Sequence, residues 1–168
     1  MLAFDVGFTW DGSSVADDER VSVRIDGEPD ALVISVDAPL HRDPPPPGTG
    51  SFDGLWDYEV VELFLVGAGE DYVELEFGPH GHFLVLRLHG ARNAVERSLP
   101  IVYAATIAGD RWRGVARVPR RLVPAGPHRA NAFAIHGVRA RRYLCATPLP
   151  GPHPDFHQPG RFPPVTLP

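Results

Sequence analysis

The chain has 168 residues, of which 43% are hydrophobic and 22% are charged, and its formal net charge at pH 7 is −5. This mild acidity, together with the scattering of the basic residues, excludes the basic surface of a typical nucleic-acid-binding protein. No segment approaches the roughly 18 consecutive apolar residues of a membrane span, so no membrane contact is expected.

Cys145 is the only cysteine, and lysine is absent. A single cysteine excludes an internal disulfide, and the N-terminal sequence lacks the pattern of a signal peptide. We therefore expect a cytoplasmic location and one domain that comprises residues 1–168. The absence of lysine excludes catalysis through a lysine Schiff base and the lysine of a phosphate-binding P-loop.

The first strand signals predict a hairpin. Val21, Val23 and Ile25 alternate with polar residues, turn residues follow at 27–30, and residues 31–36 are again apolar and β-branched. A loop follows that contains four successive prolines from Pro44 to Pro47. Because proline cannot donate a backbone hydrogen bond, this loop is expected to lie outside the sheets.

Residues 55–65 are the most informative segment of the chain. They read Leu-Trp-Asp-Tyr-Glu-Val-Val-Glu-Leu-Phe-Leu, a strongly β-prone run in which strict alternation places Glu59 and Glu62 on opposite faces. Both faces are mostly apolar, which predicts a central strand that is covered on both sides. Because a buried carboxylate is costly without a partner, Glu62 is expected to pair with an arginine, Arg87 or Arg42.

Six more strands are predicted in the rest of the chain, over residues 72–77, 83–89, 101–107, 111–118, 132–137 and 143–147. In the first of them, Tyr72, Glu74 and Glu76 share one face. No window shows a convincing helical period. Short strands separated by turns rich in proline and glycine predict an all-β fold, an antiparallel β-sandwich that is jelly-roll-like, with roughly 9–11 strands and little helix.

Two carboxylates of the 55–65 segment could serve as the acid and the base of a glycosidase. Glu59 and Glu62 are three residues apart, so a regular strand separates them unless a bulge brings both onto one face. The favoured interpretation is that Glu62 is a structural buried acid. No catalytic residue is therefore assigned, and the balance of the sequence evidence is against an enzyme.

Histidines offer the other candidate chemistry. His80 and His82 flank a turn glycine and could ligate zinc or copper if a third ligand came from Glu59, Glu62, His136 or His157. Zinc motifs are absent, so a polar surface turn is favoured and no metal or other cofactor is expected. Cys145 lies among apolar neighbours and is interpreted as a core thiol.

Several aromatic residues have charged or polar neighbours in the sequence, namely Trp10, Trp56, Tyr58, Trp112, Tyr143 and Phe156. Aromatic faces stack on the apolar faces of sugar rings, and charged side chains hydrogen-bond to sugar hydroxyls. This combination favours the binding of a small polar ligand, although an ordinary sandwich core and rim has the same composition.

Segments along nearly the whole chain resemble an uncharacterised family of small cytosolic proteins of animals and bacteria. The matching segments are 9–12, 38–39, 42–45, 55–62, 79–81, 92–93, 133–137 and 155–157. This resemblance supplies a class of protein rather than an activity.

The layout is also similar to family-9 carbohydrate-binding modules and related DOMON-like sandwiches. In these, a Trp precedes an acid-x-x-Glu strand, here Trp56 with Glu59 and Glu62. A later Trp strand ends in proline, here residues 112–119, and a closing aromatic-His-x-Pro segment corresponds to residues 156–159. The resemblance implies an antiparallel sandwich and, by analogy, a sugar site. The first acid is Glu59 rather than the usual Asp, which weakens the analogy.

The sequence thus predicts a cleft that binds a carbohydrate, with Glu62 as an anchor behind it. The candidate binding residues are Arg42, Asp43, Trp56, Glu59, His80, Arg87, His136, Tyr143 and His157. One alternative is a metal- or carboxylate-assisted enzyme acting on a sugar-like substrate. Another is a protein-interaction module whose aromatic tail, around Phe156 and Phe162, binds a partner; heme binding is weaker still.

Overall fold

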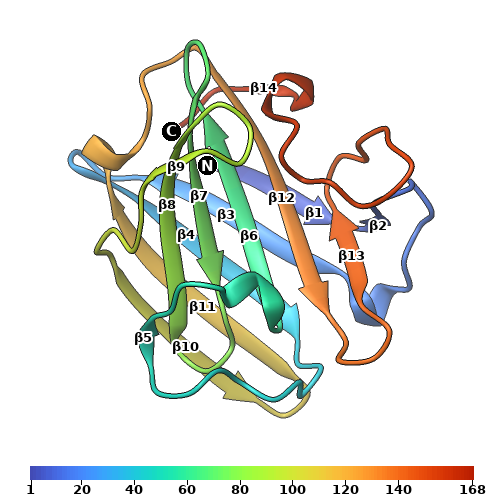
Figure 1. Ribbon diagram of the computed structural model, residues 1–168. Coiled ribbons are helices and arrows are strands. Elements are labelled where there is room, and N and C mark those ends of the chain that lie inside the picture. The colour runs from blue at the N-terminus through green and yellow to red at the C-terminus, as the bar shows by residue number, and fades with distance from the viewer.

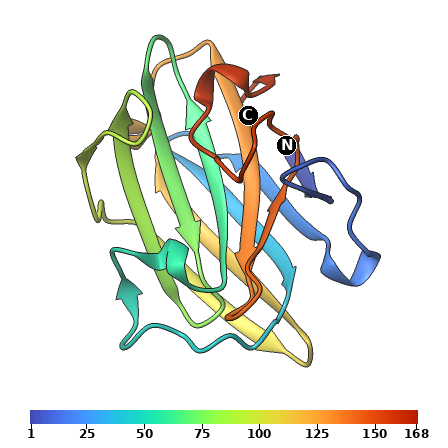
Figure 2. The ribbon, with the colours of Figure 1, turned by 45° about the vertical axis from the view of Figure 1, so that its right-hand side comes forward.

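Apolar residues at every second position build two β-sheets that pack face to face, as Figures 1 and 2 show. The computed structural model describes residues 1–168. Its helical segments are four three-residue 3-10 turns, η1 (Asp17–Glu19), η2 (Leu55–Asp57), η3 (Arg120–Leu122) and η4 (Pro159–Arg161). None of them has the length and apolarity that crossing a membrane would require. The predicted all-β class with little helix is confirmed.

The first sheet has five antiparallel strands. In spatial order they are β1 (Leu2–Val6), β3 (Val21–Gly27), β4 (Ala31–Pro39), β11 (Arg111–Pro119) and β10 (Val102–Ala108). The predicted hairpin is the β3–β4 pair, in which Val23 lies opposite Val36.

The second sheet is larger and carries the candidate site. Its strands in spatial order are β2 (Phe8–Thr9), β13 (Arg142–Cys145), β12 (His128–His136), β6 (Val60–Val66), β7 (Asp71–Phe77), β8 (His82–His89) and β5 (Gly50–Ser51), with β14 (Pro164–Val165) beside β12 and β9 (Ala94–Glu96) beside β8. All neighbours are antiparallel except β5 and β8. Ten of the fourteen strands have four residues or more, which agrees with the predicted number.

The main core lies between the two sheets. It contains 25 buried hydrophobic residues, to which β6 contributes Val61, Leu63 and Leu65. Trp112 of β11 is the largest side chain that is fully buried. Full burial of one valine, leucine or phenylalanine side chain of this core stabilises the fold by about 1.5–3 kcal/mol.

The outer face of the second sheet is also covered. A second cluster of 14 buried hydrophobic residues includes Phe64 of β6 and Phe133 of β12. The C-terminal tail supplies Phe156, which stacks on Phe133 with ring centroids 4.1 Å apart, and Phe162, which is 1% exposed. The exposed aromatic patch that would favour a protein-interaction module is therefore absent. Since both faces of β6 are covered, it is the central strand that the sequence predicts.

The start of the 55–65 segment differs from the prediction. Gly54 has a φ of 97°, and Leu55–Asp57 then form the η2 turn, so β6 begins only at Val60. A left-handed glycine interrupts an extended run because its backbone direction does not continue the pleat. As a result, Trp56 leaves the plane of the sheet and lies over its outer face.

Candidate ligand-binding site

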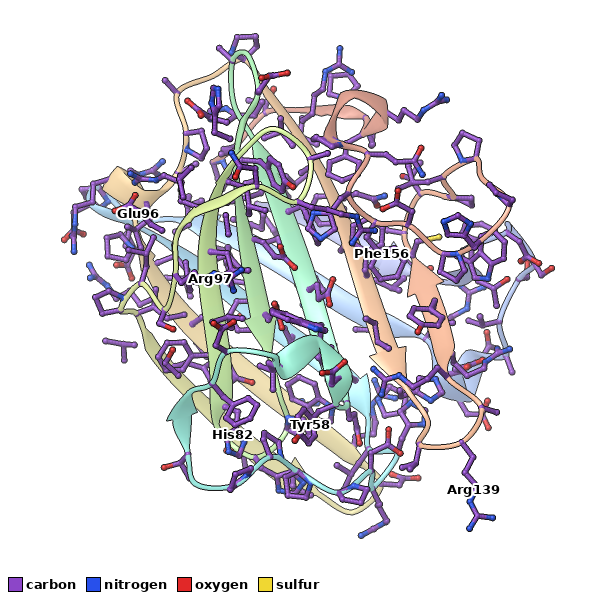
Figure 3. All side chains as sticks on the ribbon, viewed as in Figure 1. Tyr58, His82, Glu96, Arg97, Arg139 and Phe156 are labelled. Atoms are coloured by element: carbon purple, nitrogen blue, oxygen red, sulfur yellow. The ribbon has the colours of Figure 1, made fainter.

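A pocket of about 410 Å³ opens on the outer face of the larger sheet. Its floor comes from the central strands, with Glu62 of β6, Glu74 of β7 and Leu86 of β8. Two segments pass in front of these strands, namely η2 and the loop that carries β9, and the C-terminal tail lies beside β12, toward β13 (Figure 1). Figure 3 shows Arg97 over the β7–β8 side of this face and Phe156 beside β12. The pocket is therefore a gap between the sheet and these three segments.

Two arginines at the rim tie these loops together. Arg92 Nη2 donates to Asp155 Oδ1 at 2.7 Å, which joins the β9 loop to the tail. Arg97 Nη1 donates to Asp53 Oδ1 at 2.9 Å, which joins the β9 segment to the chain just before η2. Both guanidinium charges already have carboxylate partners.

Arg141, from the β12–β13 connection, holds η2 in place. Its Nη2 donates to the Trp56 carbonyl at 2.7 Å and its Nη1 to the Asp57 carbonyl at 3.0 Å. These bonds fix the turn that carries the Trp56 side chain, which is 37% exposed and lines the pocket. The rim is thus preorganised by arginines whose donors are engaged with protein groups.

Three buried glutamates share this face of the sheet, and two of them, Glu62 and Glu74, line the pocket. Glu62 is 2% exposed, Glu74 3% and Glu76 0%. In the β6–β7 register Glu62 lies opposite Glu76, while Glu74 lies two residues before Glu76 on the same face of β7. Oε2 of Glu74 and both carboxyl oxygens of Glu76 have no hydrogen-bond partner. A buried polar group without a partner costs about 1–3 kcal/mol, so this cluster destabilises the chain.

Burial and mutual repulsion hold protons on this cluster. Burial raises the pKa of Glu74 to about 7. It also raises the pKa of Glu62 and of Glu76 well above the usual range, and neighbouring carboxyls raise both further. Near neutral pH the floor therefore contains protonated carboxyl groups, which can both donate and accept hydrogen bonds.

His157 from the tail faces the same floor. The Tyr72 hydroxyl accepts the Arg92 N–H at 3.1 Å and lies 2.8 Å from His157 Nδ1. The Tyr72 hydroxyl can therefore donate its own proton to Nδ1 of His157. The imidazole proton then lies on Nε2, which is 3.9 Å from Oε2 of Glu74. Burial lowers the pKa of His157 to about 4, so this ring is neutral at physiological pH.

Of the predicted binding residues, the structure brings Trp56, Tyr143 and His157 together around this pocket. Glu62 lines it as well, and the predicted pairing of Glu62 with Arg87 or Arg42 is wrong. Arg87 pairs with Glu96 at 2.6 Å, and Arg42 donates to the Gly109 carbonyl at 3.2 Å. In these positions neither arginine pairs with the Glu62 carboxyl.

Glu59, Asp43 and His136 lie elsewhere, where the proline-rich loop meets the end of the sandwich. Glu59 accepts the backbone N–H groups of His41 and Asp43 at 3.0 and 3.3 Å. Asp43 in turn accepts the Gly137 N–H at 2.6 Å. These carboxylates anchor a loop to the β12 end.

His80 is separate from the large pocket too. It borders a small cavity of about 10 Å³ together with Glu59 and His82. No group of three or more His, Cys, Asp or Glu side chains has an arrangement suited to holding a metal ion.

Sequence reasoning did not select Glu74, Arg92, Arg97 or Arg141 as site residues, although all four line the pocket. A signal for Glu74 was present, because it shares a strand face with Tyr72 and Glu76 in a strand whose other face is apolar. The three arginines come from loops, where spacing in the sequence does not predict which way a side chain points.

No family model matches the chain. The chain is 40% identical to the Danio rerio protein named UPF0462 protein C4orf33 homolog, over 99% of this chain and 89% of that protein. It is 38% identical to the Homo sapiens UPF0462 protein C4orf33, over 93% of this chain and 83% of that protein. The chain belongs to the UPF0462 family. The predicted resemblance to a family of animal proteins is thereby confirmed.

Two solved structures share the fold of this UPF0462 chain. A candidate carbohydrate-binding protein from Bacteroides uniformis matches with a TM-score of 0.72 at 15% identity, over 96% of this chain and 84% of that one. A family-9 carbohydrate-binding module from Caldicellulosiruptor kristjanssonii in complex with cellotriose matches with a TM-score of 0.53 at 10% identity, over 79% of this chain and 68% of that one. At these identities the likeness concerns the fold, and the predicted similarity to such sandwiches is confirmed.

Proposed function

We propose that this chain binds a small carbohydrate in the pocket on the outer face of the larger sheet. The observation that carries the proposal is that one preformed pocket of about 410 Å³ combines aromatic side chains with polar groups. This volume is within the range of small-molecule sites.

The chemistry of the lining suits a sugar ring. Trp56 and Tyr143 offer aromatic rings, against which the C–H face of a pyranose can stack, and Phe156, whose ring stacks on Phe133, adds apolar surface to the lining. Glu62 and Glu74 offer carboxyl oxygens to its hydroxyls. The ion-paired rim arginines keep the loops in place, so little ordering entropy is lost on binding.

The two solved structures support the proposal by analogy. One is described as a candidate carbohydrate-binding protein, and the other is a carbohydrate-binding module bound to cellotriose. Shared architecture does not establish shared function, so the argument depends on the pocket itself.

Calorimetry and tryptophan fluorescence with a panel of mono-, di- and trisaccharides test the proposal. Trp56 is the tryptophan that lines the pocket, so a bound sugar is expected to change its emission. Trp56→Ala should weaken binding by roughly tenfold, because an aromatic stacking partner is lost. Arg113→Ala is the matched control, since its side chain is 79% exposed on the other sheet. Absence of binding to every sugar in the panel would refute the proposal.

A further inference from the structure

The buried carboxyl groups on the floor of the pocket include oxygens that accept no hydrogen bond from the protein. Glu74 is 3% exposed and its Oε2 atom has no partner, and the two carboxyl oxygens of Glu76 behind it have none either. Glu62, directly across the sheet from Glu76, is 2% exposed. A ligand that fills this pocket therefore gains most affinity if it brings hydrogen-bond donors to these carboxyl oxygens.

The floor also lacks positive charge. Three arginines line the pocket, but Arg92 and Arg97 are paired with Asp155 and Asp53, and the Arg141 donors contact backbone carbonyls. None of them forms an ion pair with Glu62, Glu74 or Glu76. The arginine charges lower the pKa of Glu62 and Glu74 from a distance, less than burial raises it.

We propose that the pocket selects sugars that carry a primary amine, with the ammonium group lying between Glu62 and Glu74. This inference rests on the proposed function and specifies the substrate class of the same site. An ammonium group supplies three N–H donors for carboxyl oxygens that have no partner, and a positive charge that favours the ionised form of a carboxyl group over its protonated form.

The aromatic lining suits the same ligand. Trp56, Tyr143 and Phe156 line the pocket with the two glutamates. A ring face attracts a cation as well as an apolar sugar face, and this attraction strengthens when the cation is removed from water. An aromatic and carboxyl-lined pocket therefore favours an aminosugar over a neutral sugar of the same shape.

The test compares three ligands with one ring, D-glucosamine, D-glucose and N-acetyl-D-glucosamine, by calorimetry at about pH 7, where an ordinary amine is largely protonated. Only glucosamine carries a charge. We expect it to bind the unaltered chain roughly tenfold more tightly than the two neutral sugars, or better, because the ammonium charge favours the ionised form of Glu74, whose pKa is about 7, and pairs with it. Glu74→Gln should remove most of this preference, whereas Glu96→Gln, at a half-exposed glutamate outside the pocket, should leave it unchanged.

The outcomes separate the two proposals. Equal or tighter binding of glucose or N-acetylglucosamine would overturn the preference for an amine and leave the carbohydrate site intact. No binding of any sugar by folded protein would overturn both. A preference for glucosamine that survives Glu74→Gln and Glu62→Gln would overturn the assigned position of the ammonium group. The comparison on the unaltered chain does not depend on the folding of any variant.

Discussion

At the scale of single residues, the buried glutamates show how a site can oppose stability. Glu74 and Glu76 face an otherwise apolar cluster without hydrogen-bond partners for three of their carboxyl oxygens. A hydrophobic residue of similar size would satisfy the same packing at lower cost. Groups of this kind, with pKa values displaced by burial and by like charges, concentrate at functional sites, and here Glu74 lies on the floor of the pocket of about 410 Å³.

Glu74→Gln should stabilise the chain at high pH. Burial raises the pKa of Glu74 in the folded chain to about 7, above its ordinary value of 4.5. The folded state thus binds this proton more tightly than the unfolded state, so its contribution to stability is present below about pH 4.5 and is lost as the pH rises through about 7. Glutamine cannot ionise, and at about pH 8 it should increase the free energy of unfolding by on the order of 2 kcal/mol.

Urea denaturation at about pH 8 and at about pH 4.5 measures this effect. At the lower pH the variant and the original chain should differ by less than about 1 kcal/mol, because both side chains are neutral in the folded state. Glu96→Gln is the control, since its partly exposed pair with Arg87 contributes little. The same difference at both pH values would contradict the assignment of a proton to Glu74.

At the scale of elements, the sequence predicts strands better than it predicts what covers them. Alternation correctly places Val61, Leu63 and Leu65 in the main core and Glu62 on the other face of β6. It fails at Trp56, because the left-handed Gly54 leads into the η2 turn and the chain becomes a strand only at Val60. The rim arginines come from loops, whose paths depend on long-range pairs such as Arg92 with Asp155, which are 63 residues apart. Such pairs have no periodic signature.

Glu59→Ala should loosen the proline-rich loop and leave ligand binding unchanged. The Glu59 carboxylate accepts the backbone N–H groups of His41 and Asp43, and removing it leaves two donors without partners. We expect a loss of about 1–3 kcal/mol in the free energy of unfolding and faster hydrogen exchange at these two amides. Glu70→Ala, at an exposed side chain, is the control. Weaker sugar binding in a folded Glu59→Ala variant would instead support a direct role for Glu59 in the site.

At the scale of the whole molecule, the same end of the sandwich joins the two sheets through a pair of histidines. His41 follows β4 of the first sheet, and His136 ends β12 of the second. Their rings stack with centroids 3.5 Å apart and an angle of 2° between planes. Glu19 and Arg142 face His136, and Asp43 and Glu59 are the nearby carboxylates. Burial lowers the pKa of both histidines, which disfavours the charged form of the stacked rings in the folded chain.

The histidine pair should destabilise the folded chain as the pH falls, whereas the glutamate cluster destabilises it as the pH rises. A histidine whose pKa is lowered by folding binds its proton more tightly in the unfolded chain, so its contribution falls as the pH drops below about 6.5. His41→Phe keeps an aromatic ring for stacking but cannot be protonated. Relative to the original chain, the variant should therefore be more stable at about pH 5 than at about pH 8, by on the order of 1 kcal/mol, in urea denaturation. His153→Gln, at an exposed residue of the tail, should show no such dependence. If His41→Phe shifts stability equally at both pH values, the stacked pair contributes packing between the sheets but no acid sensitivity.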